Sequence, residues 1–230
     1  MEAPQAEMSV VGRMLRVFYA PSETFEAVAE QRSVADWLVP TIVVAMVIFF
    51  STYVTSPIYV AETMEQMQQQ TPAEQSDAME GTVGAILIST LIAAPVMMFV
   101  MLFIGAAIYL LVGKLLGGLL GYSQCLAIVA YTSLIAILQH VVKTPLVLAK
   151  ETMNVQIGLG MFLSEEAQKS FGGALLSSID PFVVWMVVIA GLGLSILGQI
   201  ERSRAYAGVA VITLIFLSIG AFFSTLRPGG

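Results

Sequence analysis

Charged residues are scarce in this chain. They make up 11% of its 230 residues, whereas soluble domains carry about 25%. Hydrophobic residues account for 57% of the sequence, and the mean hydropathy is +0.86. The composition therefore indicates an integral membrane protein, surrounded by lipids. The few Lys and Arg residues also form no basic cluster, so we expect no binding to nucleic acid.

Cysteine and catalytic motifs are scarce as well. Cys125 is the only cysteine, which excludes an internal disulfide and a multi-cysteine metal site, and we interpret it as a small buried hydrophobe. The sequence has no His-Glu-x-x-His zinc pattern, no Gly-x-Ser-x-Gly elbow and no phosphate-binding loop ending in Gly-Lys-Ser/Thr. We therefore expect no enzyme activity, cofactor or metal. The polar first 36 residues do not have the pattern of a signal peptide.

Long apolar segments are the main feature of the sequence. Because lipid offers no partner for backbone polar groups, each such segment should be a helix. We expect an all-α fold, a polytopic helical bundle with five transmembrane helices at about residues 37–56, 83–112, 125–147, 182–200 and 207–226. The second is about 30 uncharged residues long, when a span needs roughly 20. It must tilt, kink at Pro95 or begin outside the hydrocarbon.

The N-terminal segment predicts a short amphipathic helix. Four apolar residues recur at helical spacing, namely Met8, Val11, Leu15 and Phe18. Arg13 and Arg16 lie off that line, as in helices that rest on a membrane surface. We predict an interface face formed by Arg13, Arg16 and Phe18. A pair of soluble cytosolic helices is the alternative.

A second short helix should follow. Pro21 ends the first helix and suits the first turn of the next, which places Phe25 and Val28 on one side. We therefore divide the chain into interfacial cytosolic helices at 1–36 and a five-span domain at 37–230.

Charge distribution predicts the topology. Residues 57–81 contain acidic residues and neither Lys nor Arg, which is typical of a translocated loop. A cytoplasmic N-terminus would place 6 Lys and Arg residues inside and 4 outside. Arg202 and Arg204 would then form a basic cytoplasmic turn. We predict that the N-terminus is cytoplasmic and the C-terminus lies outside.

The connection between the second and third spans is rich in glycine. Gly113, Gly117 and Gly121 recur every four residues. On a helix this spacing would expose one bare face, against which another backbone could pack closely. A plain turn that merely tolerates glycine is the alternative.

A polar cluster is predicted near the outer end of the third span. His140 and Lys143 are three residues apart and share a helix face, and Asp180 at the start of the fourth span should lie at a similar depth. Ionisable groups inside a bilayer are costly and are therefore functional candidates. A proton or ion relay is one reading. The other is structural, with Lys143 reaching the headgroups and His140 hydrogen-bonded to a neighbouring helix.

Several short motifs resemble one family. They are Gly121-Tyr122-Ser123-Gln124 with Tyr131 and Ser133 after it, Asp180-Pro181-Phe182, and Ser203-Arg204-Ala205-Tyr206. This pattern resembles the Yip domain family of five-span membrane proteins, named in eukaryotes for interaction with Ypt/Rab GTPases. The Asp-Leu-Tyr-Gly-Pro signature of the eukaryotic branch is absent. The resemblance therefore points to the prokaryotic branch and a cytoplasmic (inner) membrane location, and it implies a fold but no settled activity.

Two functions are consistent with the sequence. The first is a non-catalytic membrane organiser that recruits a protein partner or lipids through its cytosolic N-terminus. The second is a small transporter or channel that uses the His140, Lys143 and Asp180 cluster, with a homo-oligomer as one way to form a pore.

Overall fold

Long apolar helices form the body of the molecule. The computed structural model describes residues 8–70 and 76–226, and within these ranges the chain is helical or looped, without a strand. Five helical stretches in the described residues are long and apolar enough to cross a membrane: Ala35–Gln66, Gly84–Leu115, Tyr122–Lys150, Pro181–Gly198 and Arg202–Thr225. They overlap all five predicted spans. The predicted all-α five-span bundle is confirmed.

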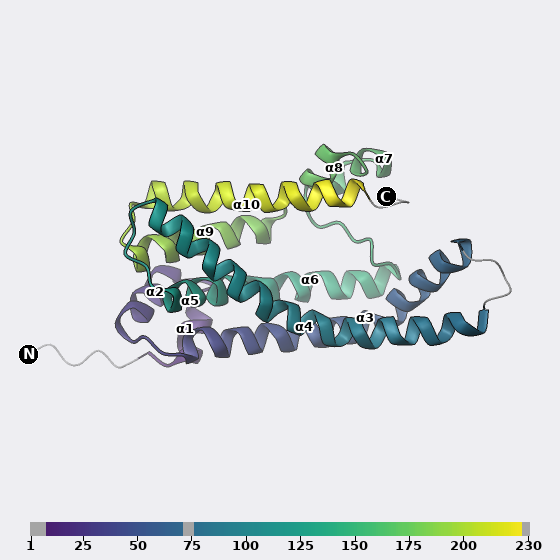
Figure 1. Cartoon of the computed structure of the whole chain (residues 1–230), viewed down its shortest axis with the longest axis horizontal. Coiled ribbons are helices and arrows are strands. Elements are labelled where there is room, and N and C mark those ends of the chain that lie inside the picture. Colours follow the sequence, from purple (N-terminus) through teal and green to yellow (C-terminus); the bar gives the residue numbers. More distant parts are fainter. Residues whose placement is uncertain (1–7, 71–75, 227–230) are drawn as a thin grey trace, which may run out of the picture.

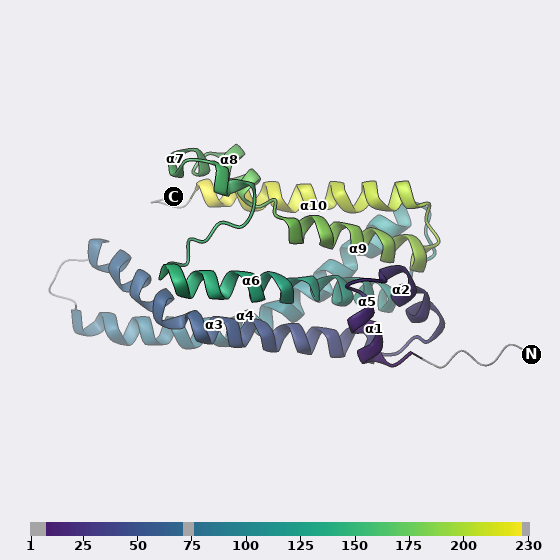
Figure 2. The same cartoon turned by 180° about the vertical axis from the view of Figure 1, so that it is seen from behind.

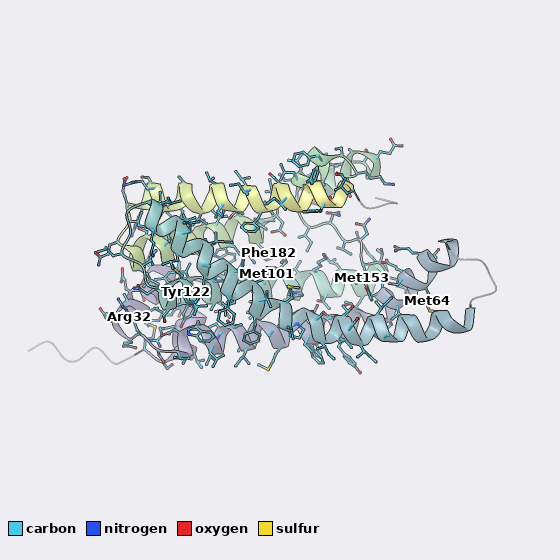
Figure 3. The ribbon with its side chains drawn as sticks, in the orientation of Figure 1. Arg32, Met64, Met101, Tyr122, Met153 and Phe182 are labelled. Carbon is cyan, nitrogen blue, oxygen red and sulfur yellow. The ribbon has the colours of Figure 1, made fainter. Side chains whose placement is uncertain are left out.

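The chain connections gather at two ends of the bundle (Figures 1 and 2). In chain order the helices are α1 Val10–Arg16, α2 Pro21–Glu30, α3 Ala35–Gln70, α4 Ser76–Leu115, α5 Tyr122–Ser133, α6 Ile135–Lys150, the 3₁₀ helix η2 Leu159–Phe162, α7 Glu165–Gln168, α8 Phe171–Ser177, α9 Pro181–Gly198 and α10 Arg202–Thr225. Helices α1 and α2 and the turns before α5 and α10 share one end, here called the N-terminal end. Figure 3 shows Arg32 and Tyr122 at that end, and Met64 and Met153 towards the opposite end.

Two helices exceed the thickness of a bilayer. Helices α3 and α4 contain 36 and 40 residues, which corresponds to about 54 and 60 Å at 1.5 Å per residue. Because the hydrocarbon layer is only about 30 Å thick, part of each helix must lie outside it. Both helices change direction part-way along (Figure 1). Pro57 in α3 and Pro95 in α4 lack the N–H that a straight helix needs, which is a sufficient cause.

Capping side chains determine where two of the helices begin. The Ser164 hydroxyl accepts a hydrogen bond of 3.3 Å from the backbone N–H of Ala167 and so caps the start of α7. Asp180 Oδ1 accepts a 2.7 Å bond from the Val183 N–H, and Pro181 occupies the first position of α9. Such caps satisfy N–H groups that have no partner within the helix. The fourth span therefore begins at the predicted Asp-Pro pair.

The buried core lies at the N-terminal end. Its large, fully buried side chains include Phe25, Leu102, Ile128, Tyr131, Leu194 and Val209. Helix α4 contributes Leu102 and Ala106, and α10 contributes Ala205 and Val209 near its start. Elsewhere these two helices expose Ile, Val and Phe side chains, as expected for surfaces that face lipid. The N-terminal end is therefore the tightly packed part of the molecule, and the candidate functional site lies there.

Candidate functional site

A buried ion pair joins the first helix to the first span. Arg13 Nη2 lies 2.9 Å from Asp36 Oδ1, and the two side chains are only 4% and 2% exposed. Arg13 belongs to α1, and Asp36 lies in the first turn of α3. Because α1 is only 7 residues long, it has little stability of its own and depends on such contacts.

Three further hydrogen bonds complete this cluster. Arg13 Nη1 donates to Gln31 Oε1 at 2.7 Å. The Tyr131 hydroxyl, from α5, donates to Asp36 Oδ1 at 3.0 Å, and the Ser33 backbone N–H donates to Asp36 Oδ2 at 3.0 Å. We call this set of residues the Arg13–Asp36–Tyr131 cluster. It connects α1, the loop after α2, α3 and α5 at a single point.

Burial makes this cluster sensitive to the loss of any member. Removing two charges from water costs several kcal/mol per ion, and good geometry with additional hydrogen bonds offsets that cost. Asp36 here accepts from a guanidinium, a hydroxyl and a backbone N–H. Loss of one partner from such a buried pair typically costs about 3–5 kcal/mol, because the other charge remains buried. Arg13 is therefore a structural residue that holds α1 in place.

An aromatic contact attaches α2 beside the cluster. Phe25 is fully buried, and its ring meets Tyr131 edge-on, with the ring centroids 6.1 Å apart. Gly193 of α9 provides the space, since a Cβ atom there would lie 2.8 Å from Phe25 Cζ. The prediction that Phe25 and Val28 share a face is confirmed, because both are buried. The prediction that this face rests on the membrane surface is wrong, because it packs into the core.

The predicted interface face is rearranged in the structure. Arg13 is buried, Phe18 packs against the core, and half-buried Arg16 pairs with Glu23 at 2.5 Å. These residues therefore do not form one exposed face. The physical reason is that the buried Asp36 carboxylate pairs with the Arg13 guanidinium, and this pairing stabilises Arg13 in the interior.

A different set of α1-region side chains faces outward. Val11, Leu15 and Tyr19 are 61%, 61% and 73% exposed. Val11 and Leu15 belong to the apolar line that the helical spacing predicted. We call these three residues the α1 edge. It is an exposed apolar surface formed by two residues of α1 and by Tyr19 in the turn after it, and the buried cluster holds α1 in place.

The glycine-rich connection is a turn rather than a helix face. Helix α4 ends at Leu115, and Gly117 adopts φ +81°, which favours glycine, with no atom near its missing side chain. Gly121 is the N-cap of α5. The predicted packing seam of Gly113, Gly117 and Gly121 is therefore wrong as a unit, because the helical spacing ends before Gly117. Only Gly113 makes a close contact, against Leu120.

This turn interlocks with the turn between α9 and α10. The Leu119 N–H donates to the Gly198 carbonyl at 3.0 Å. A Cβ atom on Gly118 would lie 2.6 Å from Ile200 Cδ1, so glycine is needed there for packing. Gln124 accepts from the Gly121 N–H at 2.8 Å and donates to the Leu197 carbonyl at 3.4 Å. The Gly121–Gln124 motif thus ties the third span to the end of the fourth.

The predicted polar cluster separates into two groups at the opposite end. His140 Nδ1 lies 3.1 Å from Ser51 Oγ, which is also 2.7 Å from Thr144 Oγ1. Asp180 Oδ2 instead accepts from Gln139 Nε2 at 2.8 Å. Successive helical residues point about 100° apart, so Gln139 and His140 reach different neighbours. The structure therefore does not show His140 and Asp180 as one relay.

Lys143 and Asp180 do share a cleft. Its volume is about 230 Å³, and Gln139 and residues of the loop 153–158 also line it. Among the side chains that the structure describes, no three His, Cys, Asp or Glu residues gather as a metal site would require. The cleft is polar and offers both a cation and a carboxylate, but His140 takes no part in lining it.

The family model of the Yip1 domain matches residues 15–224. The chain belongs to the Yip1 domain family. No curated protein and no solved structure gives a match. The family assignment confirms the resemblance and is consistent with the membrane-spanning helices of the structure.

The Yip1 match covers most of the residues described above, but it starts after Arg13. It begins inside α1 and extends almost to the end of α10. It therefore includes Phe25, Asp36, Tyr131 and Gly193. Sequence reasoning missed the Arg13–Asp36–Tyr131 cluster. An available signal was Asp36 itself, a carboxylate directly before the apolar run that begins at Trp37, where a charge requires a partner.

Proposed function

We propose that this Yip1 domain is a non-catalytic membrane organiser that recruits a partner or lipids through its N-terminal end. The observation that carries the proposal is the firmly held α1 edge. Apolar side chains that are exposed to this extent on a helix fixed by a buried ion pair are arranged for contact with another surface. A fixed helix loses little conformational entropy on binding, which favours recruitment.

The topology proposal gives this end a cellular location. With a cytoplasmic N-terminus, the basic turn at Arg202 and Arg204 lies on the cytoplasmic side, in agreement with the positive-inside rule. The structure supports this by gathering α1, α2 and that turn at one end (Figure 1). The Yip1 domain would then present its N-terminal end to the cytoplasm, in a prokaryotic inner membrane.

A transport function is the second candidate. The cleft with Lys143 and Asp180 favours it, because this cleft could admit a polar solute at the opposite end. The placement of His140 argues against a proton relay, since its hydrogen-bond partner is Ser51 rather than the cleft.

Growth complementation of a deletion strain tests the organiser proposal. Leu15→Asp should abolish complementation at normal membrane levels, because a charge on the α1 edge opposes docking to an apolar surface. Met161→Asp is the matched control, since Met161 is also 61% exposed but belongs to η2 at the opposite end. It should complement normally, and so should His140→Gln, whose amide can keep a hydrogen bond to Ser51.

Two results would contradict the proposal. One is full complementation by Leu15→Asp. The other is loss of complementation by His140→Gln at several external pH values, with normal protein levels. That second outcome, together with solute flux in proteoliposomes, would favour proton-coupled transport.

A further inference from the structure

An apolar groove runs between α4 and α10. Near the N-terminal end, a cavity of about 400 Å³ is lined by Val112 and Leu115 of α4, by Leu116 directly after it, and by Ala207, Gly208 and Val211 of α10. The end of α4 approaches α10 closely there, since a Cβ on Gly208 would lie 2.9 Å from Leu116 Cδ1 and 3.1 Å from Val112 Cγ1. Figures 1 and 2 show α4 diverging from α10 away from this point.

A second apolar cavity continues the first one towards the middle of the bundle. It measures about 250 Å³ and is lined by Met101, Ile108 and Phe216, among others. Ile212 lines both cavities, so they follow one another along α10. Met101 lies near the middle of the bundle length in Figure 3. We call the two cavities together the α4–α10 groove.

The length of this groove corresponds to one leaflet of a bilayer. From Arg204 at its mouth to Phe216 the helix advances by 12 residues, which is about 18 Å at 1.5 Å per residue. Half of a hydrocarbon layer is about 15 Å thick. The volumes of the cavities together fall in the range of about 300–1,000 Å³ that is typical of small-ligand sites. An extended acyl chain suits a groove of this length and apolar lining.

The mouth of the groove carries positive charge. Arg204 lines it, and exposed Lys114 lies in the last turn of α4 beside Leu115. Among the residues that the structure describes, the ion pairs are Arg13–Asp36 and Arg16–Glu23, so neither cation has a carboxylate partner there. The nearest acidic residue in sequence, Glu201, accepts a 2.6 Å hydrogen bond from the Ser203 hydroxyl. Arg204 at the mouth of an apolar groove complements a lipid phosphate, and Lys114 directly precedes the lining residue Leu115.

We propose that the α4–α10 groove is a binding site for one anionic phospholipid from the leaflet at the N-terminal end. Arg204 and Lys114 hold its phosphate, and one acyl chain occupies the groove down to Phe216. This site is separate from the α1 edge and does not depend on the proposed organiser function. It gives the protein a preference for anionic lipids over zwitterionic lipids.

The test measures lipid binding to the full chain, purified in detergent, by native mass spectrometry and by thermal unfolding. Phosphatidylglycerol should bind and raise the unfolding temperature, because a ligand of the native state stabilises it. Phosphatidylcholine should bind more weakly, and inorganic phosphate alone should have no effect, since it lacks the acyl chain. High salt should weaken the preference for phosphatidylglycerol.

Matched variants locate the site. Arg204→Gln should weaken phosphatidylglycerol binding roughly tenfold, as expected for the loss of one charged hydrogen bond. Arg202→Gln changes the net charge equally in the same turn but does not line the groove, so it should bind normally. Ala207→Phe should block the groove. Ala107→Phe, at an exposed α4 position outside both cavities, should not.

Three results of these experiments would overturn the proposal. Equal binding of both lipids by the wild-type chain would show that the cations do not select the headgroup. Equal effects of Arg204→Gln and Arg202→Gln would indicate non-specific surface charge. A change of oligomeric mass in Ala207→Phe, with lipid binding retained, would identify the groove as an interface between two copies of the chain.

Discussion

Asp36→Asn provides the most direct test of how the N-terminal end is held together. The substitution keeps the shape of the side chain and removes its charge. Arg13 then remains buried, with a side chain only 4% exposed and no counter-ion in the cluster. The amide oxygen can still accept from Tyr131, so the lost contribution is mainly electrostatic. We expect the free energy of unfolding to fall by about 3–5 kcal/mol.

A matched control comes from the other ion pair among the described residues. Arg16 and Glu23 also join α1 to α2, but their side chains are 42% and 57% exposed. Water screens exposed pairs, which typically contribute about 0–1 kcal/mol. Glu23→Gln should therefore have a small effect, although it breaks a bond of the same chemical type between neighbouring helices.

A double-mutant cycle isolates the pair itself. Arg13→Met removes the cation, and combining it with Asp36→Asn removes both charges. The double variant should lose clearly less stability than the sum of the two single variants, because no unpaired charge remains buried. A coupling energy of about 1–3 kcal/mol is expected for groups in direct contact.

The chain contains its own probe for this experiment. Trp37 directly follows Asp36, and its ring lies 6.0 Å from that of Phe103 in α4. Unfolding of the detergent-solubilised protein can therefore be followed by Trp fluorescence, with Trp185 replaced by Phe in every variant. If Asp36→Asn and Glu23→Gln lower stability equally, or if the cycle is additive, the buried pair does not hold α1 in place and our reasoning is refuted.

Two further predictions concern packing and topology. Gly193→Leu should lower the unfolding free energy by about 1–3 kcal/mol, because the new side chain meets the Phe25 ring; Gly84→Leu, with no atom within 4 Å of its added Cβ, should be nearly neutral in thermal unfolding. In a Cys125→Ser background, an impermeant thiol reagent applied to intact cells should label Asn154→Cys and spare Ser203→Cys. The reverse labelling pattern would invert the proposed topology.

The spans could be predicted from the sequence because the cost of an unpaired backbone group in lipid is a local constraint. Any apolar run of sufficient length must become a helix, whatever it packs against. The Asp180-Pro181 start of α9 and the Ser164 cap were equally local, since a cap acts within three residues. These features required no knowledge of other helices.

The contacts of the candidate site could not be predicted in this way, because they join residues that are far apart in the sequence. Asp36 lies 23 residues after Arg13 and 95 before Tyr131, so local periodicity could not reveal the ion pair. Periodicity did place Val11 and Leu15 on one line, and both are exposed. It could not predict that Arg13 would be buried, because a charged side chain is buried only where another residue can pair with it.

The sequence by itself determined that this chain is a five-span helical membrane protein, and its motifs were sufficient to indicate the family. Tertiary structure decided the rest. It showed that Gly117 belongs to a turn while Gly193 makes room for Phe25, and that His140 and Asp180 have separate partners. The reason is physical: hydrophobic length and capping act along the chain, whereas buried charges, ring contacts and grooves depend on which distant helices lie side by side.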